Sequence, residues 1–226
     1  MRLATWNCAR GPWPRKRDAL DTLGADIAIV TEAPRKATAD GVPWFGDHLA
    51  QNGTTVVASP AYRLEVLPAA DVPPCVNAVR VSGPQSFTLL TVWTWPAPDY
   101  KRPLRDGLEA YRTLPGPFVV AGDFNGSPCF DKPRTRLKWA ECFAAVERLG
   151  AMSAYHTYTG EPYGGETKAT HYFLRDQARP FHIDFLFIPT SWGAALRSVL
   201  VPGFEEFRLS DHRPVVVDLD AALIAG

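Results

Sequence analysis

Short apolar runs separated by turn residues follow one another along most of the chain. Runs that are rich in β-branched residues, or that alternate between apolar and polar positions, are typical of strands. Closely spaced runs between residues 54 and 93 predict an antiparallel meander. Continuous apolar character in the later runs indicates strands that are buried on both faces. The predicted strands span residues 2–7, 26–31, 54–58, 62–67, 76–81, 87–93, 118–121, 183–188 and 215–219.

Three further segments place apolar residues at helical spacing. The first of them ends at Gly24, which is a typical helix stop. Strands with helices between them predict an α/β (α+β) protein in which sheets pack together. With 226 residues, of which 46% are hydrophobic, the chain is expected to form a single domain over residues 1–226. The predicted helices span residues 15–23, 104–114 and 137–149.

Acidic residues stand at the ends of several predicted strands. Glu32 and Asp123 each follow a strand, Asp184 lies in one, and Asp211 precedes the last. A carboxylate beside a buried strand costs free energy unless it is paired, hydrogen-bonded or bound to a metal. Asp123 alone could form an ordinary turn. Four such carboxylates together would repel one another, which favours a hard divalent cation, Mg²⁺ or Mn²⁺.

The residues around these carboxylates form a series of short motifs. In their order along the chain they resemble the endonuclease/exonuclease/phosphatase superfamily, which includes pancreatic-type deoxyribonucleases and exonuclease III-like abasic-site endonucleases. The resemblance covers positions 6 to 215 and implies a four-layer α/β/β/α sandwich, with two packed mixed sheets and outer helices. The motifs are Trp6-Asn7, Glu32, Gly122-Asp123-Phe124-Asn125, His182-Ile183-Asp184-Phe185 and Ser210-Asp211-His212-Arg213-Pro214-Val215.

The resemblance implies a metal site for Mg²⁺ or Mn²⁺. Glu32 would be the principal ligand, Asn7 would lie beside it, and Asp211 would be a second acidic contact. Such a metal would polarise a phosphoryl oxygen and stabilise the leaving oxyanion.

The resemblance also implies catalytic residues for the hydrolysis of a phosphoester by in-line attack of water. His212 would bind or activate at the scissile phosphate, and Asp184 would fix its tautomer and raise its basicity. Asp123 would orient or deprotonate the water. Asn125 would donate a hydrogen bond to the phosphate.

Two positions depart from the family pattern. Many nucleases of this superfamily carry a catalytic His or Tyr after the central strand, where this chain has Trp93 and Trp95. An indole N–H donates a hydrogen bond but cannot transfer a proton in catalysis. Trp93 or Trp95 would then either stack on a base or sugar, or pack in the core. Ala9 replaces an acidic residue of the abasic-site nucleases, which makes that activity a poorer match.

Several other residues are candidates for substrate binding. His171 and Tyr172 lie in a predicted strand near a position that lines the site in several branches of the superfamily. Arg10 and Arg134 belong to basic clusters that follow predicted active-site strands, although such clusters are also typical of solvated helix faces. His182 shares a strand face with Asp184 and has an equal claim to a structural role.

Composition limits the partners. Lys and Arg together number 24, as do Asp and Glu, so the formal net charge is zero, which argues against a broadly basic surface but allows a local basic groove. No apolar run reaches the length of a membrane span, and no secretory signal pattern opens the sequence. The four scattered cysteines predict free thiols. We therefore expect a monomeric cytoplasmic protein without a membrane partner.

These observations favour a metal-dependent phosphodiesterase, with nucleic acid, DNA or RNA, as its substrate. Two alternatives remain open at this point. One is a phosphatase or small-molecule phosphodiesterase of the same superfamily. The other is a catalytically weak nucleic-acid-binding module that kept the fold.

Overall fold

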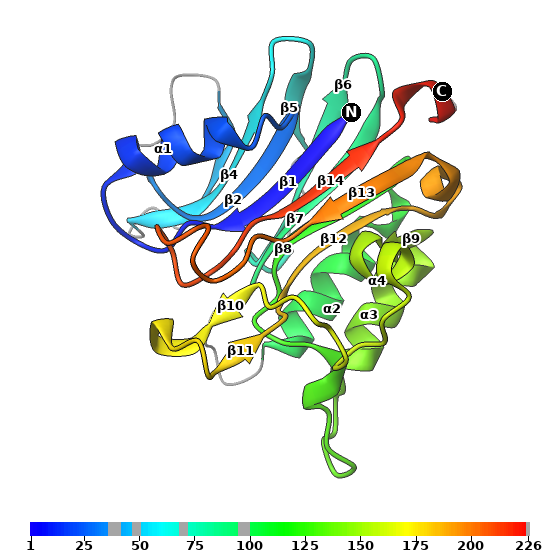
Figure 1. Ribbon diagram of the computed structural model, residues 1–226. Helices are drawn as coiled ribbons and strands as arrows, with labels where there is room; N and C mark the ends of the chain where they lie inside the picture. The colour runs from blue at the N-terminus through cyan, green and yellow to red at the C-terminus, as the bar shows by residue number, and fades with distance from the viewer. Residues whose placement is uncertain (36–41, 47–50, 68–71, 95–99, 225–226) are drawn as a thin grey trace.

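Two six-stranded β-sheets face each other in the computed structural model, which describes residues 1–35, 42–46, 51–67, 72–94 and 100–224 (Figure 1). The first sheet has the strand order β13-β14-β1-β2-β4-β3, and the second has the order β5-β6-β7-β8-β12-β9. The strands of the first sheet are β1 (Arg2–Asn7), β2 (Ile27–Pro34), β3 (Trp44–Phe45), β4 (Asn52–Ala58), β13 (Leu196–Leu200) and β14 (Val215–Leu219). Those of the second are β5 (Arg63–Leu67), β6 (Val76–Ser82), β7 (Phe87–Trp93), β8 (Phe118–Asp123), β9 (Ala151–Ser153) and β12 (Asp184–Pro189).

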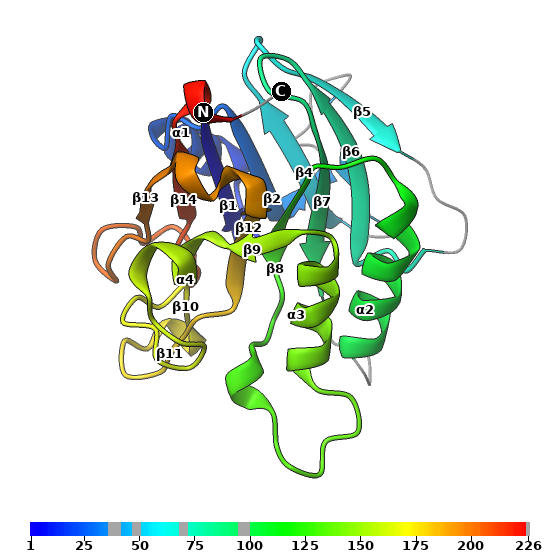
Figure 2. The ribbon, with the colours of Figure 1, turned by 90° about the vertical axis from the view of Figure 1, so that its right-hand side faces the viewer.

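Helices cover the outer faces of both sheets. Helix α1 (Trp13–Thr22) lies on the first sheet, while α2 (Lys101–Ala110) and α3 (Trp139–Arg148) pack side by side on the second (Figure 2). A short helix, α4 (Ala154–Thr159), follows β9, and a small hairpin of β10 (His171–Tyr172) and β11 (Pro180–Phe181) projects beside the sheets. No helix of the described segments is long and apolar enough to cross a membrane.

Strand alternation explains how the layers hold together. In β1, Leu3 packs into the core between the sheets, while Ala4 and Trp6 face α1. In β8, Val119 faces the other sheet and Val120 faces α2 and α3. Because successive side chains point to opposite faces, strands covered on both sides must be apolar throughout. The four-layer α/β/β/α arrangement expected from the sequence is therefore confirmed.

All nine predicted strands and all three predicted helices form, most of them with shifted ends. The predicted meander over residues 54–93 is partly wrong. Strands β5, β6 and β7 do form successive antiparallel pairs, but β4 pairs with β2 and β3 in the other sheet. The turn between β4 and β5 crosses from one sheet to the other, and a strand pattern alone does not specify to which sheet a strand belongs.

Gly122 lies near the end of β8, directly before Asp123. It has a φ of +147°, and a Cβ at this position would overlap the Val92 carbonyl oxygen on the neighbouring strand. Only glycine fits a backbone of this conformation at such a close approach. Asp123 directly follows, so this glycine sets the path of the backbone into the polar cluster.

We predict that Gly122→Ala lowers the free energy of unfolding by about 3 kcal/mol or more, because strain and overlap add. Gly150→Ala is the matched control, since Gly150 also has a positive φ, +75°, but nothing lies near its missing Cβ. The control should lose only about 1 kcal/mol. Urea denaturation measures both, and equal losses would contradict the close approach at Gly122.

Candidate active site

Polar side chains from several segments meet at one end of the two sheets. β1 ends at Asn7 and pairs in parallel with β2, which carries Glu32. In the second sheet, Asp123 at the end of β8 is the register partner of Asp184 at the start of β12. Because β1 contacts β8 and β12 across the sheet interface, these ends lie together. The segment before β14 adds His212, which bonds to Asp184.

Glu32 reaches the site through an irregularity in its strand. The register of β2 against β4 shifts between Val30 and Ala33. Glu32 lies within this shift and has a φ of +56°, which few non-glycine residues adopt. Its Oε1 accepts a hydrogen bond from Asn7 Nδ2 at 3.2 Å, and the same Nδ2 donates to Asp123 Oδ2 at 2.9 Å. Asn7 therefore links the carboxylates of the two sheets.

Asp123 and Asn125 form a tight turn at the end of β8. The Asn125 backbone N–H donates to Asp123 Oδ1 at 2.8 Å, and its Nδ2 donates to Asp123 Oδ2 at 2.9 Å and to the Thr94 carbonyl oxygen at 2.6 Å. Asn125 has a φ of +51°, which asparagine tolerates better than most residues. Asp123 is 1% exposed. Its burial, together with the nearby charge of Asp184, raises the pKa of Asp123 to about 7.

His212 and Asp184 form a buried ion pair. His212 Nδ1 lies 2.8 Å from Asp184 Oδ2, and the two side chains are 7% and 0% exposed. Burial alone would lower the pKa of His212, but the charge and hydrogen bond of Asp184 outweigh it and raise the pKa to about 9. At neutral pH His212 is therefore a cation that donates one ring proton to Asp184.

Two neighbours hold His212 in place, and neither was given a role from the sequence. Ser210 Oγ donates to the Asn7 carbonyl oxygen at 2.8 Å and accepts the His212 backbone N–H at 3.0 Å. Arg213 is buried; it donates to the carbonyl oxygens of Ser210 at 2.9 Å and Phe204 at 2.8 Å. Both residues belong to the last of the sequence motifs, but nothing in the sequence showed their roles, because the carbonyl oxygens that they contact come near only in the fold.

His171 lies against His212. An antiparallel β-bridge joins their backbones, so that their rings lie 4.3 Å apart between centroids. His171 Nε2 is 3.8 Å from Asp211 Oδ2. Burial of Asp211 opposes ionisation, but His171 and the charge of His212 hold the pKa of the Asp211 carboxyl well below its usual range. Thus each histidine has a carboxylate partner.

Two groups of side chains have ligand atoms close enough to share a cation. One consists of Asp123, Asp184 and His212, and the other of His171, Asp211 and His212. Asp184 Oδ1 is buried and has no hydrogen-bond partner in the described part of the chain, so an electron pair is left for a ligand. The carboxylate oxygens of these groups are donors that fit Mg²⁺ or Mn²⁺. His212 could ligate a metal only as a neutral imidazole, a form that its raised pKa disfavours at neutral pH.

The predicted ligands Glu32 and Asn7 lie beside these groups rather than in them. Glu32 Oε2 is 3.9 Å from the guanidinium of Arg10. Asn7 Oδ1 accepts the Ala9 N–H at 2.9 Å. Asn7 therefore presents its N–H group to the carboxylates, and acting as a ligand would require its oxygen to turn toward the cation.

The remaining predicted substrate contacts are scattered. Arg10 is exposed at the mouth of the site, where it approaches Glu32. Tyr172 is buried, with its ring against the guanidinium of Arg213 at 4.9 Å. Trp93 is partly buried beside Asp123 in the parallel pair, and Arg134 is exposed on the loop before α3. Trp95 lies outside the described residues.

Three more residues support the site without a motif to reveal them. Thr170 Oγ1 accepts the N–H groups of Ile183 and Asp184 at 2.9 and 3.0 Å. Thr94 Oγ1 donates to the Phe124 carbonyl oxygen at 2.5 Å. Lys16 comes from the same basic cluster as Arg10, for which both a solvated helix face and a place beside the site were open; it is buried, and the charges of Glu32 and Asp211 are near enough to act on its pKa.

A sandwich of two mixed sheets, with acidic residues and a histidine where their strands end, defines a class of phosphoesterase-like proteins. The model of the Endonuclease/Exonuclease/phosphatase family matches residues 4–212, and the chain belongs to this family. A search of curated proteins found no match.

Solved structures show the same fold at low sequence identity. A variant of the 3' phosphatase NExo from Neisseria, bound to a product DNA hairpin, has a TM-score of 0.70 and 21% identity over 97% of this chain and 99% of that one. The endonuclease domain of TRAS1, a telomere-specific non-LTR retrotransposon, has a TM-score of 0.68 and 16% identity, covering 96% and 97%. An AP endonuclease from Archaeoglobus fulgidus has a TM-score of 0.68 and 14% identity, covering 97% and 99%.

The His212–Asp184 pair predicts a pH-dependent stability. The folded pKa of His212, about 9, exceeds the ordinary value, so the pair stabilises the fold fully below the unfolded pKa and is lost as the pH rises through 9. In the presence of a chelator, the free energy of unfolding should fall by roughly 2 kcal/mol between about pH 7 and 9. Urea denaturation across this range measures the slope.

Asp184→Asn is the comparison variant, because it removes the charge that raises the pKa of His212. Its stability should be nearly independent of pH over the same range. A slope as steep as that of the unmodified protein would show that another group titrates.

Proposed function

We propose that the protein is a divalent-metal-dependent phosphodiester hydrolase, a nuclease that cleaves DNA or RNA by in-line attack of water. The observation that carries this proposal is the buried group of Asp123, Asp184 and His212, linked by Asn7 to Glu32. Phosphoryl transfer depends mainly on positioning and charge neutralisation, and these residues offer acidic ligands, a cation and fixed donors in one place.

Glu32 and Asp211, with Asn7, are proposed to hold Mg²⁺ or Mn²⁺. Burial lowers the pKa of Lys16, and the charges of both carboxylates oppose this shift, which supports a shared position near this lysine. The bound ion would polarise the phosphoryl oxygen and neutralise charge on the leaving oxygen.

The pKa values of Asp123 and His212 favour different roles for these two groups. Asp123, with a pKa raised to about 7, is a suitable general base for a water molecule near neutral pH. His212, whose pKa is raised to about 9, is cationic there and is suited to bind the phosphate. Asp184 holds the imidazolium in position. The Asn125 amide donates its two protons to Asp123 and to the Thr94 carbonyl oxygen, so its predicted hydrogen bond to the phosphate would require one of these bonds to open.

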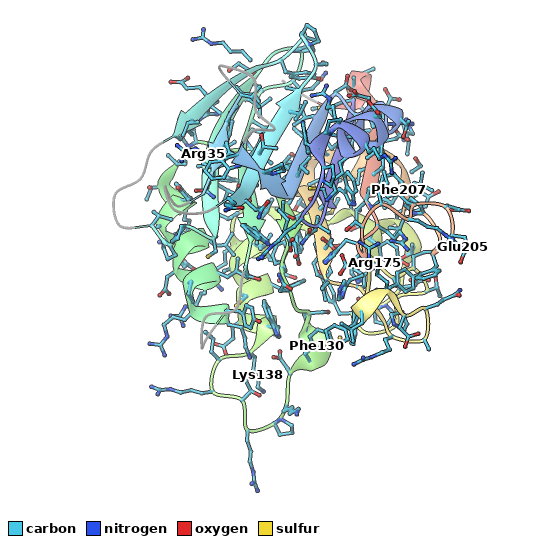
Figure 3. The ribbon with its side chains drawn as sticks, turned by 90° about the vertical axis from the view of Figure 1, so that its left-hand side faces the viewer. Arg35, Phe130, Lys138, Arg175, Glu205 and Phe207 are labelled. Atoms are coloured by element: carbon cyan, nitrogen blue, oxygen red, sulfur yellow. The ribbon has the colours of Figure 1, made fainter. Side chains whose placement is uncertain are left out.

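A nucleic-acid substrate is supported by the surroundings of the site and by the related structures. Phe130 is 39% exposed and lies on the same face as Arg175 (Figure 3). Exposed aromatic side chains on a surface that also carries cations are typical of sites at which bases stack and phosphates bind. The similar structures include a 3' phosphatase bound to DNA and an AP endonuclease. A monomeric state and a cytoplasmic location stay predictions.

Hydrolysis assays test this function. We predict that the protein cleaves bis-p-nitrophenyl phosphate and either plasmid DNA or single-stranded RNA with Mg²⁺ or Mn²⁺, and that a chelator abolishes cleavage. His212→Ala and Asp184→Ala should each lower kcat by about 100-fold or more, because each disrupts the charged pair. Glu65→Gln, an exposed carboxylate on β5, is the control and should retain activity.

Each other outcome points to a different function. Activity that survives the chelator or both substitutions would contradict the mechanism. Cleavage of p-nitrophenyl phosphate alone would favour a phosphatase. Nucleic-acid binding without any hydrolysis would favour a binding module.

A further inference from the structure

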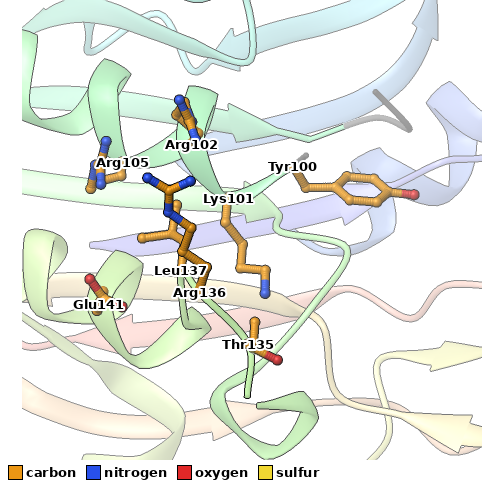
Figure 4. Close-up of a pocket in the computed structure, with 8 residues that line it drawn as sticks. All are labelled: Tyr100, Lys101, Arg102, Arg105, Thr135, Arg136, Leu137 and Glu141. Atoms are coloured by element: carbon orange, nitrogen blue, oxygen red, sulfur yellow. The ribbon is translucent and has the colours of Figure 1, made fainter. Parts of the chain in front are cut away.

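A cavity of about 510 Å³ lies between the start of α2 and the loop that leads into α3 (Figure 4). Lys101, Arg102 and Arg105 from α2 and Arg136 from the loop line it, and we call it the basic pocket. Figure 4 shows Arg102, Arg105 and Arg136 grouped on one side, and Lys101 extending toward the loop. Glu141 is the acidic residue of the lining.

The charges on α2 run against the helix dipole. Lys101, Arg102 and Arg105 occupy its first turns, and no acidic residue lies in the first turn. Cations at a helix N-terminus are destabilising, since the dipole is positive there. Helix α3 has the favourable order, with Glu141 in its first turn and Arg148 in its last. An unfavourable charge order on one of two neighbouring helices indicates a requirement other than folding.

Three acidic residues near the pocket, in the part of the chain that the structure describes, are engaged in contacts of their own. Asp131 accepts the backbone N–H groups of Trp139 and Ala140 at 2.7 and 2.9 Å, and Glu141 accepts that of Lys138 at 3.0 Å. Asp106 pairs with Arg105 at 2.7 Å, but both side chains are exposed, so water screens this pair. The N-terminus of α3 is thus satisfied internally, and its contacts hold the loop that carries Arg136.

Both walls of the pocket continue from strands that end at the active site. The segment leading to α2 follows Thr94, whose carbonyl oxygen accepts the Asn125 amide. The loop with Arg136 follows Asn125 itself. β7 and β8 are parallel, so both segments leave the second sheet at the same end. The basic pocket therefore lies on the side of the site where α2 and α3 begin.

We propose that the basic pocket binds backbone phosphates of the nucleic-acid strand whose scissile phosphate lies in the active site. Several cations that line one cavity match a strand that presents successive phosphates, and each contact with a phosphate releases a counterion. The inference rests on the proposed function and extends it, because a substrate with a single phosphodiester offers one phosphate where a strand offers several. The pocket would thus favour polymers over small phosphodiesters.

Strand binding in a chelator tests the pocket without turnover. The probe is a fluorescein-labelled single-stranded DNA oligonucleotide, followed by anisotropy at several NaCl concentrations. For Arg102→Gln/Arg136→Gln we expect about tenfold weaker binding and a salt slope shallower by about 1.4, since each single-strand phosphate contact contributes about 0.7. Arg102→Lys/Arg136→Lys should retain most of the affinity, because a phosphate contact needs mainly charge.

The matched control removes two arginines at the far end of the molecule. Arg63 begins β5 opposite Ser82, and Arg112 follows the last turn of α2, so Arg63→Gln/Arg112→Gln has the same net charge as the pocket variant. Its affinity should fall much less. Equal losses in the two variants would show a general charge effect and overturn the proposal.

Two further results separate the possibilities. If inorganic phosphate displaces the strand at equal phosphate concentration, the pocket recognises isolated phosphate and the strand proposal is wrong. If the pocket variant binds the strand as the unmodified protein does, the pocket is not a strand site, whatever the hydrolysis assays show. Absence of hydrolysis with normal, pocket-dependent binding would contradict the proposed function alone.

Discussion

The burial of two carboxylates side by side is the constraint on which the rest of the site depends. Asp123 and Asp184 are register partners on adjacent strands, and both are almost completely buried. Two like charges at this spacing raise the free energy of the fold unless cations or donors compensate. His212 supplies a cation on one side, and Asn7 and Asn125 supply amide donors on the other. Asp184 Oδ1 still lacks a partner among the described residues, so the compensation is incomplete without a ligand.

The backbone is distorted where it serves this cluster. Among the described residues, the non-glycine positions with positive φ include Ala9, Glu32 and Asn125, all on segments that enter the site. Such conformations cost free energy and persist only where surrounding contacts determine them. Here the contacts are hydrogen bonds: Asn7 Oδ1 accepts the Ala9 N–H, and Asp123 Oδ1 accepts the Asn125 N–H. The apolar layers above and below the sheets provide the stability that this distortion requires.

The periodicity of the sequence was sufficient to predict the strands and helices. Both sheets are covered on two faces, so their strands are apolar throughout and easily recognised. Periodicity did not predict to which sheet each strand belongs, because pairing depends on the path of the chain between strands. Strand β4, for example, pairs with β2 in the first sheet and not with β5. The motifs identified the carboxylates and His212, since charged residues at the ends of apolar runs are conspicuous. Supporting residues such as Thr170 and Arg213 had no such signal, because their roles arise from contacts made only after folding. For Lys16 the sequence left a solvated face and a place beside the site open, and its burial depends on how α1 lies against the site.

The central claim is that the carboxylates of the site hold a cation with Glu32 as a principal ligand, and metal binding tests it most directly. Thermal unfolding of the metal-free protein should shift upward with Mg²⁺ or Mn²⁺, by an amount equivalent to about 2.7 kcal/mol at about 100 times the dissociation constant. The shift should disappear in Glu32→Gln and persist in the surface control Glu65→Gln. No shift at millimolar metal in the unmodified protein, or an undiminished shift in Glu32→Gln, would contradict the account.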